Sequence, residues 1–181
     1  GQSLLMQRWG DAFARHGMVV AQVLLTHADL SQRPRANNAR NALDKLRELG
    51  AVPIINENDA VAVDEIRFGD NDALAAMVTP LCDGDLLLLL SDVEGLLDGR
   101  GERVSALAAV DEAAFALVRP GASPVGTGGM RSKLEAARRA TLAGAHAVIA
   151  GADLPGVLGR VLAGEDVGTL VMAHERALSN R

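Results

Sequence analysis

A glycine-rich segment followed by a lysine is the first stretch whose residue types could do chemistry. It reads GTGGMRSK, over residues 126–133, and it opens a helical pattern. Successive glycines leave backbone N–H groups able to bind phosphate oxygens, and the N-terminus of a helix adds about half a positive charge. The side chain of Lys133 leans back toward that terminus, so its ammonium can reach the same anion. The segment therefore predicts a phosphate site, with a glycine hinge before a surface helix as the alternative.

This segment differs from the P-loop of many nucleotide-binding proteins. The P-loop pattern places a glycine directly before its lysine, where this chain has Ser132. No predicted strand leads into the segment either. The phosphate prediction thus depends on the helix terminus and on Lys133.

An acidic stretch is the second candidate. Residues 56–72, NENDAVAVDEIRFGDND, hold six carboxylates and one arginine. Asp59, Asp70 and Asp72 could surround a bound amine, a lysine ammonium or a Mg²⁺ ion carried by a nucleotide, because each of these would relieve their mutual repulsion. The alternative is a solvated acidic loop. The stretch is a poor fit to an EF-hand, since the sixth position counted from Asp70 lacks the required glycine.

Amide side chains in the same stretch favour a binding site over a solvated loop. Asn56, Asn58 and Asn71 can each donate and accept hydrogen bonds. The stretch also begins where an apolar run ends, and ligands of open parallel sheets bind beyond the carboxyl ends of the strands. We therefore expect one wall of a site here.

Ser91 and Asp92 are the third candidate, at the end of another apolar run in LLLLLSDVEGLLDG. Asp92 could contact a ribose or an adenine, or orient a lysine. The alternative is a helix cap or an Asx-turn, for which both residue types are suited. The four histidines and the single cysteine show no zinc-ligand spacing, so we expect the histidines to be structural.

Four apolar runs predict the buried parallel strands that would position these residues. The runs are MVVAQVLL (18–25), AVPII (51–55), DLLLLL (85–90) and HAVIA (146–150). Helical patterns occur at the start of the chain and over 37–50, 71–82, 110–118 and 130–144. Strand alternating with helix indicates an α/β domain whose parallel sheet is covered on both faces, and 181 residues suit one domain.

Composition and charge exclude several classes of protein. The net charge is −5 without a basic stripe, and aromatic residues make up 2%, so we expect no nucleic acid and no membrane as partner. A single cysteine allows no intrachain disulfide, and no apolar run approaches the roughly 20 residues of a membrane helix. We expect a cytoplasmic location. A nicotinamide dehydrogenase is disfavoured, because no G-x-G-x-x-G joins a first strand to a helix.

Four motifs taken together, VPIINEND, FGDND, LLLLSDVEGL and GTGGMRSKLEAA, resemble in type and order those of the glutamate 5-kinases, a branch of the amino acid kinase family. The resemblance runs over nearly the whole chain, from GQSLLMQRW to GTLVMAHERALSNR. It implies a three-layer αβα sandwich with a mainly parallel sheet, in a single domain over residues 1–181. It also implies that, with Mg²⁺, the γ-phosphoryl group of ATP is transferred to the side-chain carboxylate of L-glutamate. The product would be glutamyl 5-phosphate, in the first step of proline biosynthesis.

The resemblance assigns roles to residues by motif. Lys133 and Asp72 are expected to be catalytic, and Asp59, Asn71 and Asn56 to bind the substrate. Nucleotide contacts are expected from Ser91, Asp92, Thr127, Gly128, Gly129, Met130, Arg131, Ser132 and Lys133. Which acid contacts the substrate ammonium, a lysine or Mg²⁺ stays open.

Two segments of the family have no counterpart in the resemblance. Relatives open with a strand and a glycine/serine loop that carries a second phosphate-binding lysine, and many continue into a C-terminal PUA domain. We therefore expect a partial domain with the N-terminal strands missing. The family further implies a homo-oligomer and a functional link to glutamyl phosphate reductase. The alternatives are a non-catalytic nucleotide- or glutamate-binding fragment of the same fold, and a related kinase acting on acetylglutamate, aspartate, carbamate or uridylate.

Overall fold

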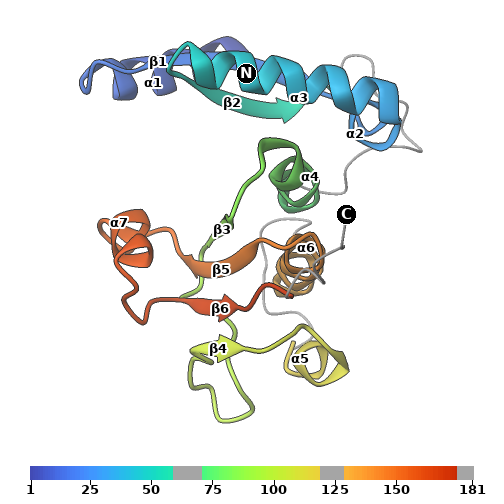
Figure 1. The fold of residues 1–181 in the computed structure, drawn as a ribbon. Helices are drawn as coiled ribbons and strands as arrows, with labels where there is room; N and C mark the ends of the chain where they lie inside the picture. The colour runs from blue at the N-terminus through green and yellow to red at the C-terminus, as the bar shows by residue number, and fades with distance from the viewer. Residues whose placement is uncertain (59–70, 119–128, 175–181) are drawn as a thin grey trace. The chain divides into compact units, whose positions relative to one another are not determined.

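The computed structural model describes residues 1–58, 71–118 and 129–174. The chain divides into two compact units, Gly1–Leu74 and Ala75–Arg181. Figure 1 colours the elements of these units in chain order, from blue to red. The single domain expected over residues 1–181 stays a prediction.

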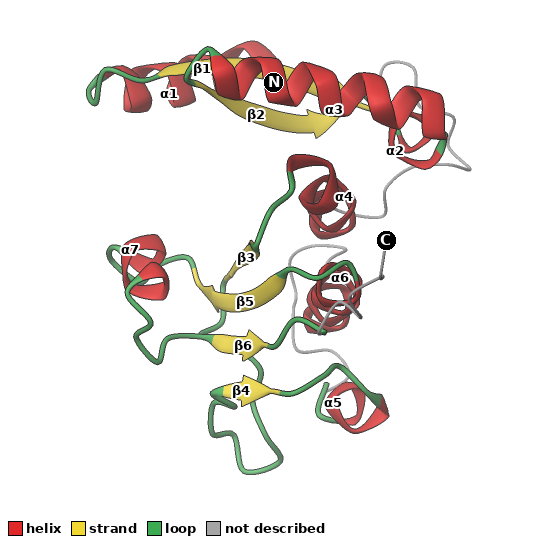
Figure 2. Cartoon of the chain, in the orientation of Figure 1, coloured by secondary structure: helices red, strands yellow, loops and turns green. Residues whose placement is uncertain are grey.

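Residues 1–58 of the first unit form a parallel pair of strands and three helices. The helices are α1 (Gln2–Ala14), α2 (His27–Ser31) and α3 (Arg33–Glu48), and the strands are β1 (Val19–Leu25) and β2 (Ala51–Glu57). The strands pair in parallel from Val19 opposite Ala51 to Leu25 opposite Glu57, so their carboxyl ends lie at the same edge. Figure 2 shows α3 running along the pair. Both predicted strands of this part of the chain are confirmed.

The ends of α2 and α3 follow from local chemistry. Gly50, expected to stop a helix, has a φ of +67°, a left-handed conformation that glycine adopts without strain, and α3 ends just before it. The short helix α2 was not predicted. Thr26 caps it, because the Thr26 hydroxyl accepts from the backbone N–H of Asp29 while the Asp29 carboxylate accepts from the N–H of Thr26.

Helix α4 (Asn71–Val78) spans the boundary between the units, and a 3-10 helix, η2 (Thr79–Cys82), follows it. The remaining elements belong to the second unit. They are β3 (Leu86–Ser91), β4 (Ala106–Leu107), α5 (Glu112–Ala116), α6 (Met130–Leu142), β5 (His146–Gly151), α7 (Val157–Leu162) and β6 (Thr169–Val171). The predicted strands over 85–90 and 146–150 and the helices over 71–82 and 130–144 are confirmed. The helix expected over 110–118 is shorter, since Asp111 caps its start.

The sheet of the second unit has the strand order β3-β5-β6-β4. Strands β3 and β5 are parallel, from Leu86 opposite His146 to Ser91 opposite Gly151. Strand β6 is antiparallel to β5 and parallel to β4. The expectation of a mainly parallel sheet is therefore confirmed, with one antiparallel pairing that the sequence did not indicate.

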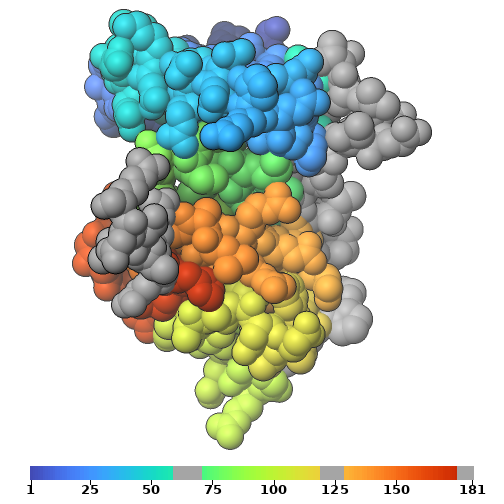
Figure 3. All heavy atoms as spheres, turned by 45° about the vertical axis from the view of Figure 1, so that its right-hand side comes forward, coloured from blue at the N-terminus to red at the C-terminus, as the bar shows by residue number. Residues whose placement is uncertain are grey.

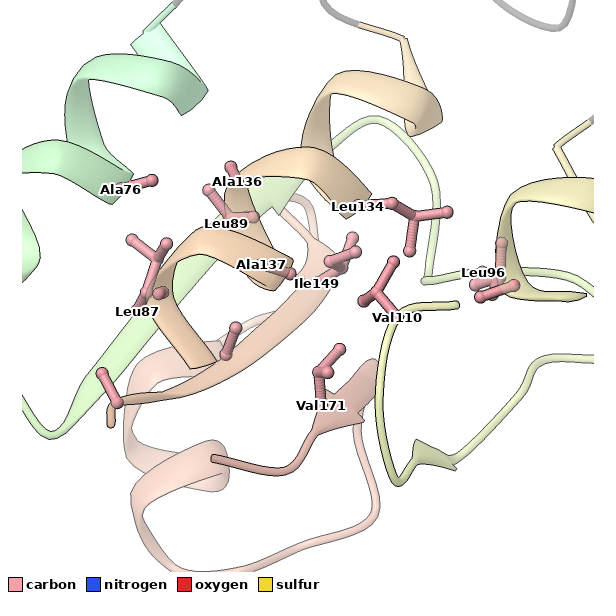
Figure 4. Close-up of a cluster of buried hydrophobic side chains, with 14 residues drawn as sticks. Ala76, Leu87, Leu89, Leu96, Val110, Leu134, Ala136, Ala137, Ile149 and Val171 are labelled. Carbon is pink, nitrogen blue, oxygen red and sulfur yellow. The ribbon is translucent and has the colours of Figure 1, made fainter. Parts of the chain in front are cut away.

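Apolar side chains cover both faces of this sheet. On one face Leu87, Leu89 and Ile149 pack with α5 and α6, in the cluster drawn in Figure 4. On the other face Val148 and Ala150 pack with α7. Figure 1 shows α7 on one side of the sheet and α5 and α6 on the other. Alternate residues of each buried strand thus face opposite helical layers, which is the αβα layering expected of this class.

Helix α6 contributes most to this core and also reaches the surface. Leu134, Ala137 and Ala140 are 0% exposed, whereas Leu142 on the same helix is 62% exposed. Figure 3 shows the outer face of α6, in orange, at the surface beside α5, in yellow. None of the helices in the described part of the chain has the length and apolar character that a membrane-spanning helix needs.

Candidate functional site

A pocket of about 470 Å³ opens at the carboxyl ends of β3 and β5 in the second unit. Ser91 and Gly151, the paired last residues of the two strands, both line it. The other lining residues come from α7 and from the loops around the strands. They are Asp92, Val93, Glu94, Arg103, Asp153, Leu154, Pro155, Arg160, Asp166, Val167 and Gly168. The pocket lies where ligands of parallel sheets generally bind.

Two predicted nucleotide contacts lie together in this pocket. Ser91 is buried, and its hydroxyl donates a 3.1 Å hydrogen bond to Oδ1 of Asp92, whose side chain is exposed. A carboxylate can accept several hydrogen bonds, so Asp92 retains acceptor capacity for a hydroxyl or amino group of a ligand. The structure thus confirms the expected position of this pair, and the role of the pair stays a prediction.

An ion pair fixes another part of the pocket wall. Nη1 of Arg103 lies 3.0 Å from Oδ1 of Asp166 and also donates to the carbonyl oxygen of Gly168. The hydroxyl of Ser105 donates a 3.0 Å hydrogen bond to the other carboxylate oxygen of Asp166. The hydrogen bond from Arg103, followed by that from Ser105, holds the pKa of Asp166 below its ordinary value.

Replacing Asp166 by asparagine is expected to lower the melting temperature in a pH-dependent way. The folded-state pKa of Asp166 lies below its ordinary value of 3.8. Its stabilising contribution is therefore complete above that value and is lost as the pH falls through the folded-state pKa. Thermal melts of both proteins between about pH 7 and pH 3 measure this effect. The difference between the two melting temperatures should stay constant down to about pH 5 and shrink below pH 3.8.

Asp153→Asn provides the matched control, because it removes one charge from the lining of the same pocket. A difference for Asp166→Asn that persists unchanged to the lowest pH contradicts the ion-pair explanation. So does an equal pH-dependent difference for Asp153→Asn.

The glycine-rich segment leads into a helix, α6, as predicted. Thr127 and Gly128 lie outside the described residues. Gly129 occupies the N-cap position with extended backbone, and Met130 begins the helix and packs against the core. Lys133, half-buried, lies in the first turn, where its side chain can lean toward the N-terminus. The phosphate-binding role of these residues, and of half-buried Ser132, stays a prediction.

Arg131 is held against its neighbours in the second unit. Its Nε lies 3.2 Å from Oε1 of Glu135, one turn along α6. Its guanidinium lies over the ring of Phe115, 5.1 Å from the centroid, an arrangement favoured by the ring's quadrupole. No residue of α6 is among those that line the 470 Å³ pocket. The structure therefore does not bring Lys133 or Arg131 into the same pocket wall as Ser91 and Asp92.

The predicted substrate residues belong to the first unit. Asn56 lies near the carboxyl end of β2, and its Oδ1 accepts a 2.9 Å hydrogen bond from the N–H of Glu57. Asn71, exposed, begins α4, and Asp72 follows it in the first turn. A carboxylate in that position also stabilises the helix through the helix dipole. Asp59 lies outside the described residues, so the expected grouping of these four side chains stays a prediction.

The described ranges 1–58, 71–118 and 129–174 contain no group of three or more His, Cys, Asp or Glu side chains that could hold a metal ion. Most of the acidic stretch lies outside these ranges. The residues that the structure describes therefore do not provide a protein cage for the expected Mg²⁺, and we assign it no ligands.

Several pocket residues were missed from the sequence. Arg103 and Asp166 are separated by 63 positions, and Gly168 comes just before a three-residue strand. The only local signal was Gly-Thr before the apolar residues Leu-Val. That signal indicates a turn into a strand but not a pocket wall.

Comparisons with known proteins identify the family of the chain. Residues 1–151 match the sequence profile of the Amino acid kinase family. Glutamate 5-kinase of Myxococcus xanthus (strain DK1622) is 49% identical over 175 residues, which cover 93% of this chain and 46% of the relative. Glutamate 5-kinase of Syntrophotalea carbinolica is 48% identical over 187 residues, which cover 100% of this chain and 50% of the relative. The chain spans about half the length of the curated relatives it matches.

Solved structures resemble the chain in fold. A carbamate kinase from Giardia superposes with a TM-score of 0.64 at 16% identity, covering 93% of this chain and 68% of that one. UMP kinase from Ureaplasma parvum superposes with a TM-score of 0.59 at 13% identity, covering 93% of this chain and 66% of that one. These likenesses concern the fold alone and agree with the α/β architecture.

Proposed function

We propose, from the premise that this chain belongs to the amino acid kinase family, that it transfers the γ-phosphoryl group of ATP to the side-chain carboxylate of L-glutamate. The observation that carries the proposal is the 48–49% identity to glutamate 5-kinases over 93% or more of the chain. The product is glutamyl 5-phosphate, the first intermediate of proline biosynthesis.

ATP is assigned to the second unit. The pocket at the ends of β3 and β5 supports this, because it offers the exposed carboxylate of Asp92 to the hydroxyl or amino groups of a nucleoside. The phosphates are assigned to the N-terminus of α6, with backbone N–H groups of residues 127–132 and the ammonium of Lys133 as donors. Arg131 contributes through its backbone in this assignment, since Glu135 and Phe115 hold its side chain.

Glutamate is assigned to the acidic stretch and its amides. Amide groups of Asn56 and Asn71 can donate to the carboxylates of the substrate. The carboxylate of Asp59 can accept from the α-ammonium, a charge-assisted bond. Asp72 is assigned a catalytic role, in which its carboxylate would stabilise a cation of the site.

The chemistry requires positioning more than proton transfer. An ionised side-chain carboxylate is already a nucleophile, so no general base is needed. One carboxylate oxygen forms a bond to the γ-phosphorus while the bond from that phosphorus to the bridging oxygen breaks, and ADP leaves with the electron pair. Lys133 and the backbone N–H groups stabilise the charge on the moving phosphoryl group. Mg²⁺ would neutralise phosphate charge as it enters with ATP.

Replacing Asp59 by alanine is expected to raise the KM for glutamate and leave that for ATP nearly unchanged. Loss of a hydrogen bond between charged groups costs roughly 1.5–3 kcal/mol, which corresponds to about a 10- to 100-fold rise in KM. Steady-state kinetics with each substrate varied in turn measure the two constants. Asp64→Ala, in the same acidic stretch but without an assigned role, is the control. A raised KM for ATP with that for glutamate unchanged would place Asp59 on the nucleotide side.

One experiment separates catalysis from binding alone. ADP release by the protein is measured with and without L-glutamate, alongside ATP binding by calorimetry. Glutamate-dependent release supports the proposal. ATP binding without release, at any glutamate concentration, would instead support a non-catalytic nucleotide-binding module of the same fold.

The proposed function also suggests a partner enzyme, an oligomeric state and a cellular location. Acyl phosphates hydrolyse readily, which favours a functional link to glutamyl phosphate reductase, the enzyme that consumes the product. A homo-oligomer is proposed from the family, and a cytoplasmic location from the supply of ATP and glutamate there. Size-exclusion chromatography with light scattering tests the oligomeric state.

A further inference from the structure

The hydroxyl of Thr169 joins two segments that line the pocket. It accepts a 2.9 Å hydrogen bond from the N–H of Leu96 and donates a 2.7 Å bond to the carbonyl oxygen of Val104. Thr169 is 0% exposed at the start of β6. The same hydroxyl therefore satisfies one backbone donor and one backbone acceptor that are far from it in the sequence.

These bonds close the base of a loop. Val104 donates a 2.8 Å hydrogen bond to the carbonyl oxygen of Leu96, and Leu97 and Arg103 form an antiparallel bridge beyond it. In a regular antiparallel pair the N–H of Leu96 would bond directly to Val104. Here the Thr169 hydroxyl lies between the N–H of Leu96 and the carbonyl oxygen of Val104 and bonds to both. The base of the loop is thus closed by one direct backbone hydrogen bond and by a side chain of another strand.

The backbone at Gly95 approaches the same hydroxyl closely, and the backbone at Gly168, the residue before Thr169, approaches β5. A Cβ atom at Gly95 would lie 2.7 Å from Oγ1 of Thr169. Gly168 has a φ of +72°, and a Cβ atom there would lie 2.8 Å from Cβ of Ala150. Both positions therefore require glycine. The backbone therefore packs closely against its neighbours just before Leu96 and just before Thr169.

The segments that these contacts hold are those that line the pocket. Asp92, Val93 and Glu94 come just before Gly95, and residues 166–168 come just before Thr169. The guanidinium of Arg103, next to Val104, binds the segment 166–168 as well, through Asp166 and the carbonyl of Gly168. The Thr169 hydroxyl lies behind the pocket and is not among its lining residues.

We propose that Thr169 is a positioning residue of the pocket, whose buried hydroxyl holds the segment from Ser91 to Leu96 in the conformation that accepts the nucleotide. The identity of the occupant rests on the proposed function. The arrangement of the loop does not, because it follows from the hydrogen bonds alone. A change confined to Thr169 should therefore alter both the mobility of the loop and the affinity for nucleotide.

Thr169→Val and Thr169→Ser test this in the intact protein. Valine keeps the shape but leaves the N–H of Leu96 and the carbonyl of Val104 without their partner, whereas serine keeps the hydroxyl. We expect Thr169→Val to weaken binding of a non-hydrolysable ATP analogue and to raise the KM for ATP by roughly 10-fold, as for one or two unsatisfied buried groups. The KM for glutamate should stay within about twofold. Thr169→Ser should restore the wild-type values.

Thr141→Val is the matched control. Thr141 is also 0% exposed in the second unit, but its hydroxyl donates to the carbonyl oxygen of Arg138 in its own helix. We expect this variant to lower the melting temperature without changing nucleotide affinity. If Thr169→Val lowers the melting temperature and likewise leaves nucleotide affinity unchanged, Thr169 is merely structural and the proposal is overturned.

Hydrogen exchange at the amide of Leu96 can be measured in the wild-type protein, so this test does not depend on whether a variant folds. Coupling between the pocket and this hydrogen bond is reciprocal, so a saturating ATP analogue should slow the exchange of this amide in the wild-type protein. Unchanged exchange overturns the proposal even if nucleotide binds normally. A wild-type protein that binds no nucleotide overturns the proposed function as well, which distinguishes the two failures.

Discussion

Replacing Lys133 by alanine in the intact protein is expected to lower kcat by about 10²-fold or more, as for removal of one donor to the transition state. The lysine lies in the first turn of α6, next to the N-terminus that is assigned to the phosphates. Its ammonium would stabilise charge that develops as the phosphoryl group moves, so the loss should appear in kcat. Steady-state kinetics at saturating ATP and glutamate measure it.

Arg138→Ala is the control for this prediction. Arg138 is an exposed cation of the same helix, more than one turn from Lys133, and has no assigned role. Its loss should leave kcat within about twofold of the wild-type value, as for an ordinary surface change. A kcat near normal for Lys133→Ala would remove this lysine from the catalytic machinery.

Replacing Leu134 by alanine is expected to lower the free energy of unfolding by about 3 kcal/mol, within the 2–5 kcal/mol typical of buried leucines. Leu134 is 0% exposed and lies in the cluster between α6 and the sheet (Figure 4). Truncation removes its apolar contacts and leaves a cavity that the surrounding strands and helices can fill only in part. Chemical denaturation followed by circular dichroism measures the change.

Leu142→Ala makes the same chemical change at a position of α6 that is 62% exposed. Leucine and alanine have similar helix propensities, so this variant should change stability by less than about 0.5 kcal/mol. Equal losses for the two variants would contradict the assignment of the core to one face of α6. A large loss of stability for Leu142→Ala alone would mean that the core contacts the opposite face of α6.

The long elements could be predicted because each shows its own pattern. In α6 the small and apolar residues Leu134, Ala137 and Ala140 recur at helical spacing and are buried together. In β5 Ala147 to Ala150 are all buried, since helices cover both faces, and they form a continuous apolar run as expected. In these elements the local pattern and the tertiary environment agree.

The short elements could not be predicted because tertiary pairing defines them. Strand β6 has three residues, too few for a period-two pattern, and exists through its pairing with β5 and β4. Helix α7 has six residues, including Gly159, a poor helix former. Strand β6 thus depends on its neighbouring strands, and α7 depends on its packing against the sheet.

The candidate site divides in the same way. Ser91 and Asp92 were found because they follow an apolar run directly. The rule that ligands bind beyond the carboxyl ends of strands can be applied to such neighbouring residues without knowing the tertiary structure. The hydrogen bond between Leu96 and Thr169 joins residues 73 positions apart, so no local pattern could indicate it. Grouping of Asp59 with Asn71 remains a prediction from motif alone.

Product trapping tests the central claim, phosphoryl transfer to a glutamate carboxylate, most directly. An acyl phosphate reacts with hydroxylamine to give a stable hydroxamate, which mass spectrometry identifies. With ATP and L-glutamate, we expect the γ-glutamyl hydroxamate to form in step with ADP, and far slower ADP release with aspartate, acetylglutamate, carbamate or uridylate. ADP release that is independent of L-glutamate, or faster with one of the other acceptors, would contradict it.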